Sequence, residues 1–124
     1  MNPQKTGLHA DALFMTIPTA GSHPDMLEGI VETCGLPRER IVIIRTKPHV
    51  DLPSGCIVVD DFDSPNIQRW WKRGIDESVA RGATAVAVLN DDLRIEPDTL
   101  EKLHDELLAT GATVATPSRP GLER

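Results

Sequence analysis

Residues 83–98 read Ala83-Thr-Ala-Val-Ala-Val-Leu-Asn-Asp-Asp-Leu-Arg-Ile-Glu-Pro-Asp98 and carry the strongest indication of the fold class. The apolar run 86–89 stops at Asn90, Asp91 and Asp92, a pattern that predicts a buried strand with two adjacent carboxylates at its carboxyl end. In an open α/β sheet that edge is where ligands bind. Adjacent carboxylates repel each other unless a cation or a ligand group lies between them. The stretch therefore indicates a divalent metal that holds a phosphate-bearing ligand.

Outward from this stretch, apolar runs alternate with helix signals. Strands are predicted at 13–17, 41–44, 56–59, 86–89 and 112–115. Helices are predicted from Pro24 to Gly35, from a Ser64-Pro65 start through 66–81, and from Pro97 to about Gly111. Proline is favoured at the first position of a helix and glycine just after its end. Because the run 41–44 is apolar throughout, it is expected to be buried on both faces, as in a parallel sheet. The alternation predicts an α/β fold, with a mostly parallel sheet flanked by helices.

Each predicted helix has an expected core face. In the first helix the spacing i, i+3, i+4, i+7 is occupied by Leu27, Ile30, Val31 and Cys34. In the second helix the expected core residues are Ile67, Trp70 or Trp71, Ile75 and Val79. In the third they are Leu100, Leu103, Leu107 and Leu108.

Length and charge limit the classes of protein that fit. The chain has 124 residues and a formal net charge of −6, which suits one globular domain. We predict a flexible leader at 1–11, a domain over 12–118 and a tail at 119–124. An acidic chain without a Lys/Arg cluster is a poor ligand for a phosphate backbone, so no nucleic-acid partner is expected.

The N-terminal residues and the cysteines carry no targeting or disulfide signal. There is no signal-peptide pattern and no apolar run of the roughly 20 residues that span a bilayer. We therefore expect no membrane span and a cytoplasmic location. Cys34 and Cys56 are expected to be small core residues, and the four histidines are assigned no chemistry.

Three features together resemble GT-A glycosyltransferases, most closely glycosyltransferase family 2. The first strand leads into Ile17-Pro-Thr19, similar to that family's Pro-Thr turn. The segment Asn66-Ile-Gln-Arg-Trp-Trp-Lys-Arg-Gly-Ile75 resembles the helix before the metal-binding strand. The segment Val88-Leu-Asn-Asp-Asp-Leu-Arg-Ile-Glu-Pro-Asp-Thr-Leu100 resembles the family's form of the Asp-x-Asp motif. The resemblance extends from about Leu13 to Pro117 and implies a Rossmann-like GT-A fold in a truncated or minimal form.

The resemblance implies a function and a metal site. The chain would be the donor-binding domain of a metal-dependent glycosyltransferase that takes a sugar from a UDP- or GDP-type donor to an unknown acceptor. Asp92 and Asp91 would bind Mn²⁺ or Mg²⁺, which neutralises the diphosphate leaving group. Asn90 and Asp91 would hold ribose hydroxyls or a metal-bound water. From the three residues alone, an Asx-type turn that ends a strand fits equally well.

The other implied nucleotide-sugar contacts lie at the ends of earlier elements. Thr19 and Ala20 form a small-residue loop that lets a ligand approach the backbone, although an ordinary strand-to-helix turn has the same composition. Arg45 stands near where many family members have an acidic residue, so it is either a phosphate or ribose contact or a solvated charge. Asp60 and Asp61 are either ligand contacts or solvated loop carboxylates favourable to the next helix dipole.

The last implied contact lies on the predicted second helix. There Arg73 matches the family's arginine, and Lys72 replaces an asparagine. Arg73 is either a diphosphate contact or a surface cation.

Beyond the metal strand, the family adds an acceptor-binding half with a carboxylate base, and this chain shows no second acidic motif. Three interpretations stay open: a fragment of a longer enzyme, a homo-oligomer that completes the acceptor site, or a non-catalytic, degenerate binding protein. The adjacent Trp70 and Trp71 and the exposed sheet edges are compatible with association. No glycine-rich phosphate loop is present, which disfavours other nucleotide-binding folds.

Overall fold

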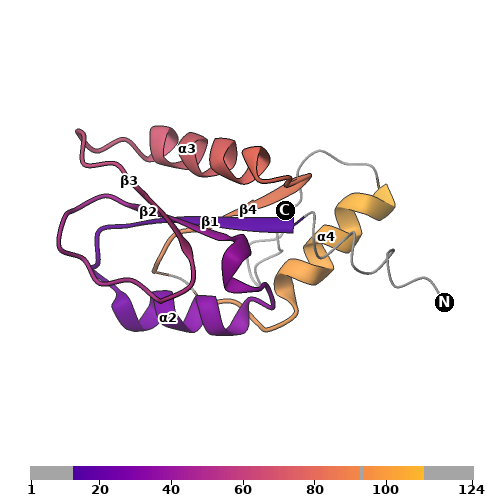
Figure 1. Cartoon of the computed structure of the whole chain (residues 1–124). Coiled ribbons are helices and arrows are strands. Elements are labelled where there is room, and N and C mark those ends of the chain that lie inside the picture. The colour runs from indigo at the N-terminus through magenta and orange to yellow at the C-terminus, as the bar shows by residue number, and fades with distance from the viewer. Residues whose placement is uncertain (1–12, 93, 111–124) are drawn as a thin grey trace, which may run out of the picture.

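The structure is a computed structural model that describes residues 13–92 and 94–110 (Figure 1). The described strands are β1 (Leu13–Thr19), β2 (Ile41–Arg45), β3 (Ile57–Asp60) and β4 (Ala85–Val88). The described helices are α2 (Pro24–Thr33), the 3₁₀ turn η1 (Arg38–Arg40), α3 (Ile67–Ala80) and α4 (Thr99–Thr110). The sheet has four parallel strands in the order β3-β2-β1-β4. The predicted α/β class and the parallel sheet are thus confirmed.

Strand β1 is the centre of the sheet. It pairs with β2 from Met15 to Thr19 and with β4 from Leu13 to Thr16, and all seven of its residues are buried. It is two residues longer than predicted, because it continues through Pro18 to Thr19. Strand β2 is also buried, as its unbroken apolar run predicted. Strand β3 lies at one edge and is only half-buried.

Helix α2 covers one face of the sheet and α3 covers the other (Figure 1). The predicted face of the first helix is confirmed, since Leu27, Ile30, Val31 and Cys34 are all buried in one cluster. Pro24 is the first residue of α2, and Gly35 after its end has a φ of +84°, which suits a residue without a side chain. Cys34 is buried as predicted, whereas Cys56 is only partly buried; both are free thiols.

The predicted core face of α3 is confirmed only at Trp70, which is partly buried against the cluster that contains Phe14 and Val42. Ile67, Ile75 and Val79 are exposed, and the helix buries Gly74 and Ser78 instead. The reason is a close approach to the sheet: a Cβ placed on Gly74 would lie 1.8 Å from Thr16 Oγ1 and 2.7 Å from Thr16 Cβ. Small residues permit this contact, so the larger apolar side chains are displaced to the flanks of the helix.

The predicted start of this helix also needs correction. The helix is capped by Asn66, whose side-chain oxygen accepts a hydrogen bond of 3.0 Å from the Arg69 backbone N–H, and not by Ser64. Asparagine is among the best N-cap residues because it satisfies an otherwise unpaired N–H of the first turn.

Replacing Asn66 with alanine is expected to lower the free energy of unfolding by about 1 kcal/mol, since the cap is lost. Urea unfolding of Asn66→Ala and Asn66→Ser measures this. Serine is also a good N-cap, so Asn66→Ser should be close to the wild type. Equal losses in both variants would show that the cap contributes nothing.

Helix α4 follows the predicted third helix in its position and in part of its packing, since Leu103 and Leu107 are partly buried. Leu100 is buried with the α2-side cluster and His104 is buried, but Leu108, expected in the core, is half exposed. The predicted strand 112–115, the leader 1–11 and the tail beyond 118 lie outside the described residues. Within the described part of the chain, no helix is long and apolar enough to cross a membrane.

Candidate functional site

A pocket lies where the strand order reverses. Strands β1, β2 and β3 follow one another in one direction, whereas β4 lies on the other side of β1. In parallel α/β sheets, the carboxyl ends of the strands at this switch point form a crevice where ligands bind. Here the pocket has a volume of about 260 Å³. Its lining consists of Pro18, Thr19, Ala20, Ser22, His23, Thr46, Ile67, Trp70, Asn90, Asp91 and Asp92.

Two strand ends are joined by a hydrogen bond at this pocket. The Thr19 hydroxyl donates to a carboxylate oxygen of Asp91 over 2.6 Å, and Thr19 Oγ1 accepts from the Gly21 N–H at 3.1 Å. Gly21 has a φ of +82°, and a Cβ there would lie 2.8 Å from a Val50 methyl, so the turn requires glycine. Asp91 is thereby held at the end of β1 although 72 residues separate it from Thr19.

Asp92 and Asn90 are exposed beside this held carboxylate. Asp92 makes no hydrogen bond or ion pair with any residue in the ranges 13–92 and 94–110. Two neighbouring carboxylates, one held and one free, form an oxygen donor set of the kind that hard divalent cations accept. No group of three or more His, Cys, Asp or Glu side chains suited to a metal occurs in the described part of the chain.

Aromatic and apolar side chains also line this pocket. Trp70 and Ile67 from the start of α3 contribute to it. Trp70 Nε1 is buried and has no hydrogen-bond partner within the described residues. The buried Thr46 hydroxyl donates to the Thr19 carbonyl over 3.1 Å, which links β2 to the same turn.

Arg45 and Asp60 lie apart from the lining of this pocket. The Arg45 guanidinium forms a two-pronged pair with the Asp60 carboxylate, with N···O distances of 2.7 and 2.9 Å. These hydrogen bonds hold the pKa of Asp60 below its ordinary value. Arg45 is therefore ion-paired, and the pair is partly exposed to solvent.

Asp61 lies in a second ion-pair cluster outside the pocket. Its side chain is fully buried, and Arg69 donates to both carboxylate oxygens at 2.9 and 3.0 Å. Arg73 adds a contact of 3.2 Å, and the Asp63 N–H donates at 3.2 Å. These hydrogen bonds, those from Arg69 foremost, lower the pKa of Asp61 to about 2 although burial acts in the opposite direction. The alternative that Asp61 is a solvated loop carboxylate is wrong.

Strand geometry explains why two adjacent aspartates have different partners. Successive side chains of a strand point to opposite faces of the sheet. The Asp61 N–H donates to the Arg45 carbonyl over 2.9 Å, so the extended backbone continues past the end of β3. Asp60 therefore meets its strand neighbour Arg45, and Asp61 meets the arginines of α3.

The structure thus divides the predicted site. Thr19, Ala20, Asn90, Asp91 and Asp92 line one pocket, whereas Arg45, Asp60, Asp61 and Arg73 form ion pairs nearer β3. Their roles toward a ligand stay predictions. The predicted site residues did not include six lining residues and one arginine: Ser22, His23, Thr46, Pro18, Ile67, Trp70 and Arg69. Ser22, His23 and Thr46 could have been found from the sequence, because they lie in the segments that directly follow β1 and β2.

Comparisons of the chain with protein-family models, with curated proteins and with solved structures found no match.

Proposed function

We propose that the chain is the donor-binding domain of a metal-dependent glycosyltransferase that uses a nucleoside-diphosphate sugar of the UDP or GDP type. One observation supports this most directly. Asp91 and Asp92, after β4, share a pocket with the Thr19–Ala20 turn after β1, at the point where the strand order reverses. Ligands of parallel α/β folds bind at such points.

The donor set is compatible with a divalent cation and a diphosphate. Mg²⁺ is usually bound by one or two protein carboxylates, with water and phosphate oxygens completing the shell. Asp92 and Asp91 would supply these carboxylates, so no third protein ligand is needed. A bound Mn²⁺ or Mg²⁺ neutralises negative charge that develops on a diphosphate leaving group.

The residues of the chain itself bind and orient the ligand in this proposal. Thr19 fixes the Asp91 carboxylate through its hydroxyl, and Asn90 offers an exposed amide for ribose hydroxyls or a water. Trp70 gives a flat apolar wall, which suits a base or sugar face.

The ion pairs near β3 have an accessory role in this proposal. One pair joins Arg45 to Asp60, at the carboxyl ends of β2 and β3. The other joins Asp61, just after β3, to Arg73 of α3. Strands β2 and β3 continue the sheet from β1. Arg45 is matched one to one by Asp60, so we propose that this pair shapes the edge. Asp61 is shared by Arg69 and Arg73, so their cluster keeps one positive charge, which favours a phosphate there.

A second candidate is a non-catalytic binding protein on the same scaffold. The observation that favours it is the small donor set, since the described residues contain no cluster of three metal-binding side chains. Transfer of sugar to any acceptor by this chain would exclude this candidate.

Replacing Asp92 with alanine is expected to weaken metal-dependent nucleotide binding at least about tenfold, because a charged metal ligand is removed. Isothermal titration calorimetry with UDP, GDP and their sugar conjugates, with and without Mn²⁺, measures this. The matched control is Asp105→Ala, which removes an exposed carboxylate of α4. Equal binding by wild type and Asp92→Ala, or no binding of any nucleotide by the wild type, would overturn the proposal.

A further inference from the structure

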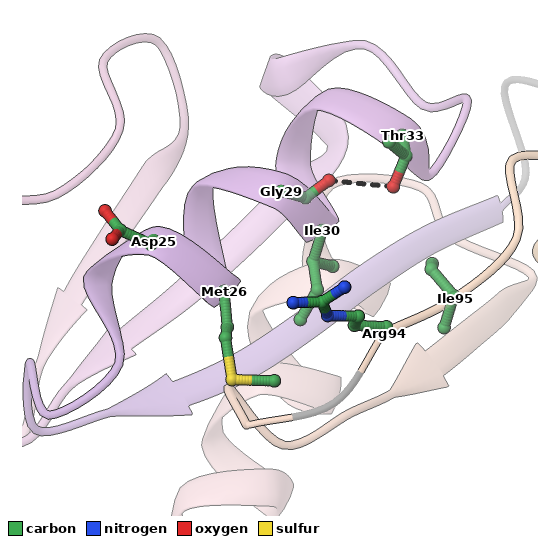
Figure 2. Close-up of a pocket in the computed structure, with 7 residues that line it drawn as sticks. All are labelled: Asp25, Met26, Gly29, Ile30, Thr33, Arg94 and Ile95. Atoms are coloured by element: carbon green, nitrogen blue, oxygen red, sulfur yellow. Dashed lines mark hydrogen bonds between the residues drawn. The ribbon is translucent and has the colours of Figure 1, made fainter.

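A second pocket lies on the opposite side of the sheet from α3, between α2 and the segment that leads to α4 (Figure 2). Its volume is about 270 Å³. Met26, Gly29 and Ile30 line it from α2, and Arg94 and Ile95 line it from the other side. It shares no residue with the pocket that holds Asp91 and Asp92, so it is independent of the proposed donor site.

The floor of this pocket is apolar and is left open by a glycine. Gly29 lies in the middle of α2 with an ordinary helical backbone, and a Cβ added there would meet nothing within 4 Å. Glycine inside a helix is less favourable than alanine, and the packing of the described residues does not require it here. Glycine is otherwise used where a ligand approaches the backbone closely.

The backbone group exposed by this glycine already has a partner. The Thr33 hydroxyl donates to the Gly29 carbonyl over 2.7 Å, as Figure 2 shows. A ligand would therefore meet a satisfied carbonyl beside the side chains of Ile30, Met26 and Ile95. This part of the pocket suits an apolar group.

Arg94 gives the pocket one cationic group. Its side chain extends from the segment after β4 into the pocket that Ile30 also lines (Figure 2). Arg94 is exposed and makes no hydrogen bond or ion pair with the residues that the structure describes, and the Asp25 carboxylate at the rim points away from it. In a chain of net charge −6, a guanidinium that has no partner among the described residues and lies beside an apolar floor is suited to a carboxylate, which it can bind through two parallel hydrogen bonds.

We propose that this pocket binds a small amphipathic carboxylate, with its apolar chain on Gly29 and Ile30 and its carboxylate on Arg94. The volume limits the ligand to a short-chain acid. The pocket would thus be a second ligand site on the other side of the sheet from the one proposed for the donor.

Hexanoate is the probe, and its neutral isostere hexanamide is the comparison. Both are titrated into the ¹⁵N-labelled full chain, and the backbone amide shifts of Gly29, Ile30 and Ile95 are followed. Hexanoate is expected to bind roughly five- to tenfold more tightly than hexanamide, because a charge-assisted hydrogen bond is stronger than a neutral one.

Three variants assign the binding to this pocket. Gly29→Leu fills the open space with a good helix former, so it should keep the fold and abolish binding of both probes. Arg94→Gln should remove the preference for the acid while hexanamide still binds. Lys47→Gln, which removes an exposed cation that does not line the pocket, should leave both affinities unchanged.

Several results would overturn this inference. They are equal affinities of the two probes for the wild type, unchanged hexanoate binding in Gly29→Leu or Arg94→Gln, or no shifts at the three amides. None of these results depends on nucleotide or metal, so failure here leaves the proposed donor site untouched. Conversely, this test stays valid if the nucleotide titrations overturn the proposed donor site.

Discussion

Replacing Gly74 with alanine is expected to lower the free energy of unfolding by roughly 3 kcal/mol, because overpacking of a tight core contact costs at least 1–3 kcal/mol. The new methyl carbon would lie 1.8 Å from Thr16 Oγ1, 2.7 Å from Thr16 Cβ and 2.9 Å from its methyl group. All three distances are shorter than a van der Waals contact, so the helix or the strand has to move.

Neither element can move without loss of other contacts. Thr16 lies in the central strand, is fully buried, and is paired with β2 on one side and β4 on the other. On α3, the Ser78 hydroxyl donates to the Gly74 carbonyl over 2.7 Å, one turn along the same buried face. Because threonine is β-branched and stiff at χ1, rotation of its side chain gives little relief. The usual gain of about 1 kcal/mol for alanine in a helix is therefore outweighed.

Chemical unfolding of a double-mutant cycle measures this effect. Thr16→Ala removes two of the three clashing atoms, and it also removes a buried hydroxyl that has no partner within the described residues. We expect Thr16→Ala to recover part of the stability lost in Gly74→Ala, so that the two changes are not additive. The matched control is Gly29→Ala in α2, where open space surrounds the new methyl and a gain of about 0.5–1 kcal/mol is expected. A loss of less than 0.5 kcal/mol in Gly74→Ala would contradict the tight contact.

Gly74 also explains why one helix face was predicted correctly and another was not. Apolar spacing identifies a core face when large side chains make the contact, as Leu27 and Ile30 do in α2. In α3 the contact is made by Gly74 and Ser78, which carry no hydropathy signal. A glycine in a helix can either lower its stability or permit close packing against a strand. Which of the two applies depends on the position of the strand, and a single sequence does not specify that position.

The predicted site residues fall into two separate groups for a similar reason. The sequence placed Thr19 and Asp91 after strands, and parallel strands end at the same edge of a sheet, so their meeting could be expected once β1 and β4 are neighbours. The strand order that makes them neighbours is a tertiary feature. The pairing of Asp60 with Arg45, and of Asp61 with Arg69, depends on strand register and on the rotation of α3. Neither can be inferred from the residue types alone.

Replacing Asp61 with asparagine is expected to lower the free energy of unfolding by roughly 2 kcal/mol, because hydrogen bonds between charged groups are lost and a buried amide is poorly matched to two donors. Asp61 joins the end of β3 to α3 through Arg69 and Arg73. Its side chain is fully buried, whereas the two arginine side chains are 30% and 45% exposed. Water can therefore solvate the arginines in part after the change, and we expect less than the 3–5 kcal/mol seen for fully buried pairs.

The pH dependence of this difference tests the charge itself. The pKa of Asp61 is lowered to about 2 in the folded protein from an ordinary value of 3.8. The unfolded chain therefore binds more protons between these values, and the contribution of the carboxylate is complete above about pH 4 and lost as the pH falls toward 2. Urea unfolding at pH 6, 4 and 2.5 measures the difference in the free energy of unfolding between wild type and Asp61→Asn. This difference should be nearly constant at the two higher pH values and smaller at pH 2.5. Asp51→Asn, which changes an exposed carboxylate, should show no comparable gap at any pH. A gap for Asp61→Asn that stays the same down to pH 2.5 would mean that the shape of the side chain, and not its charge, stabilises the junction between β3 and α3.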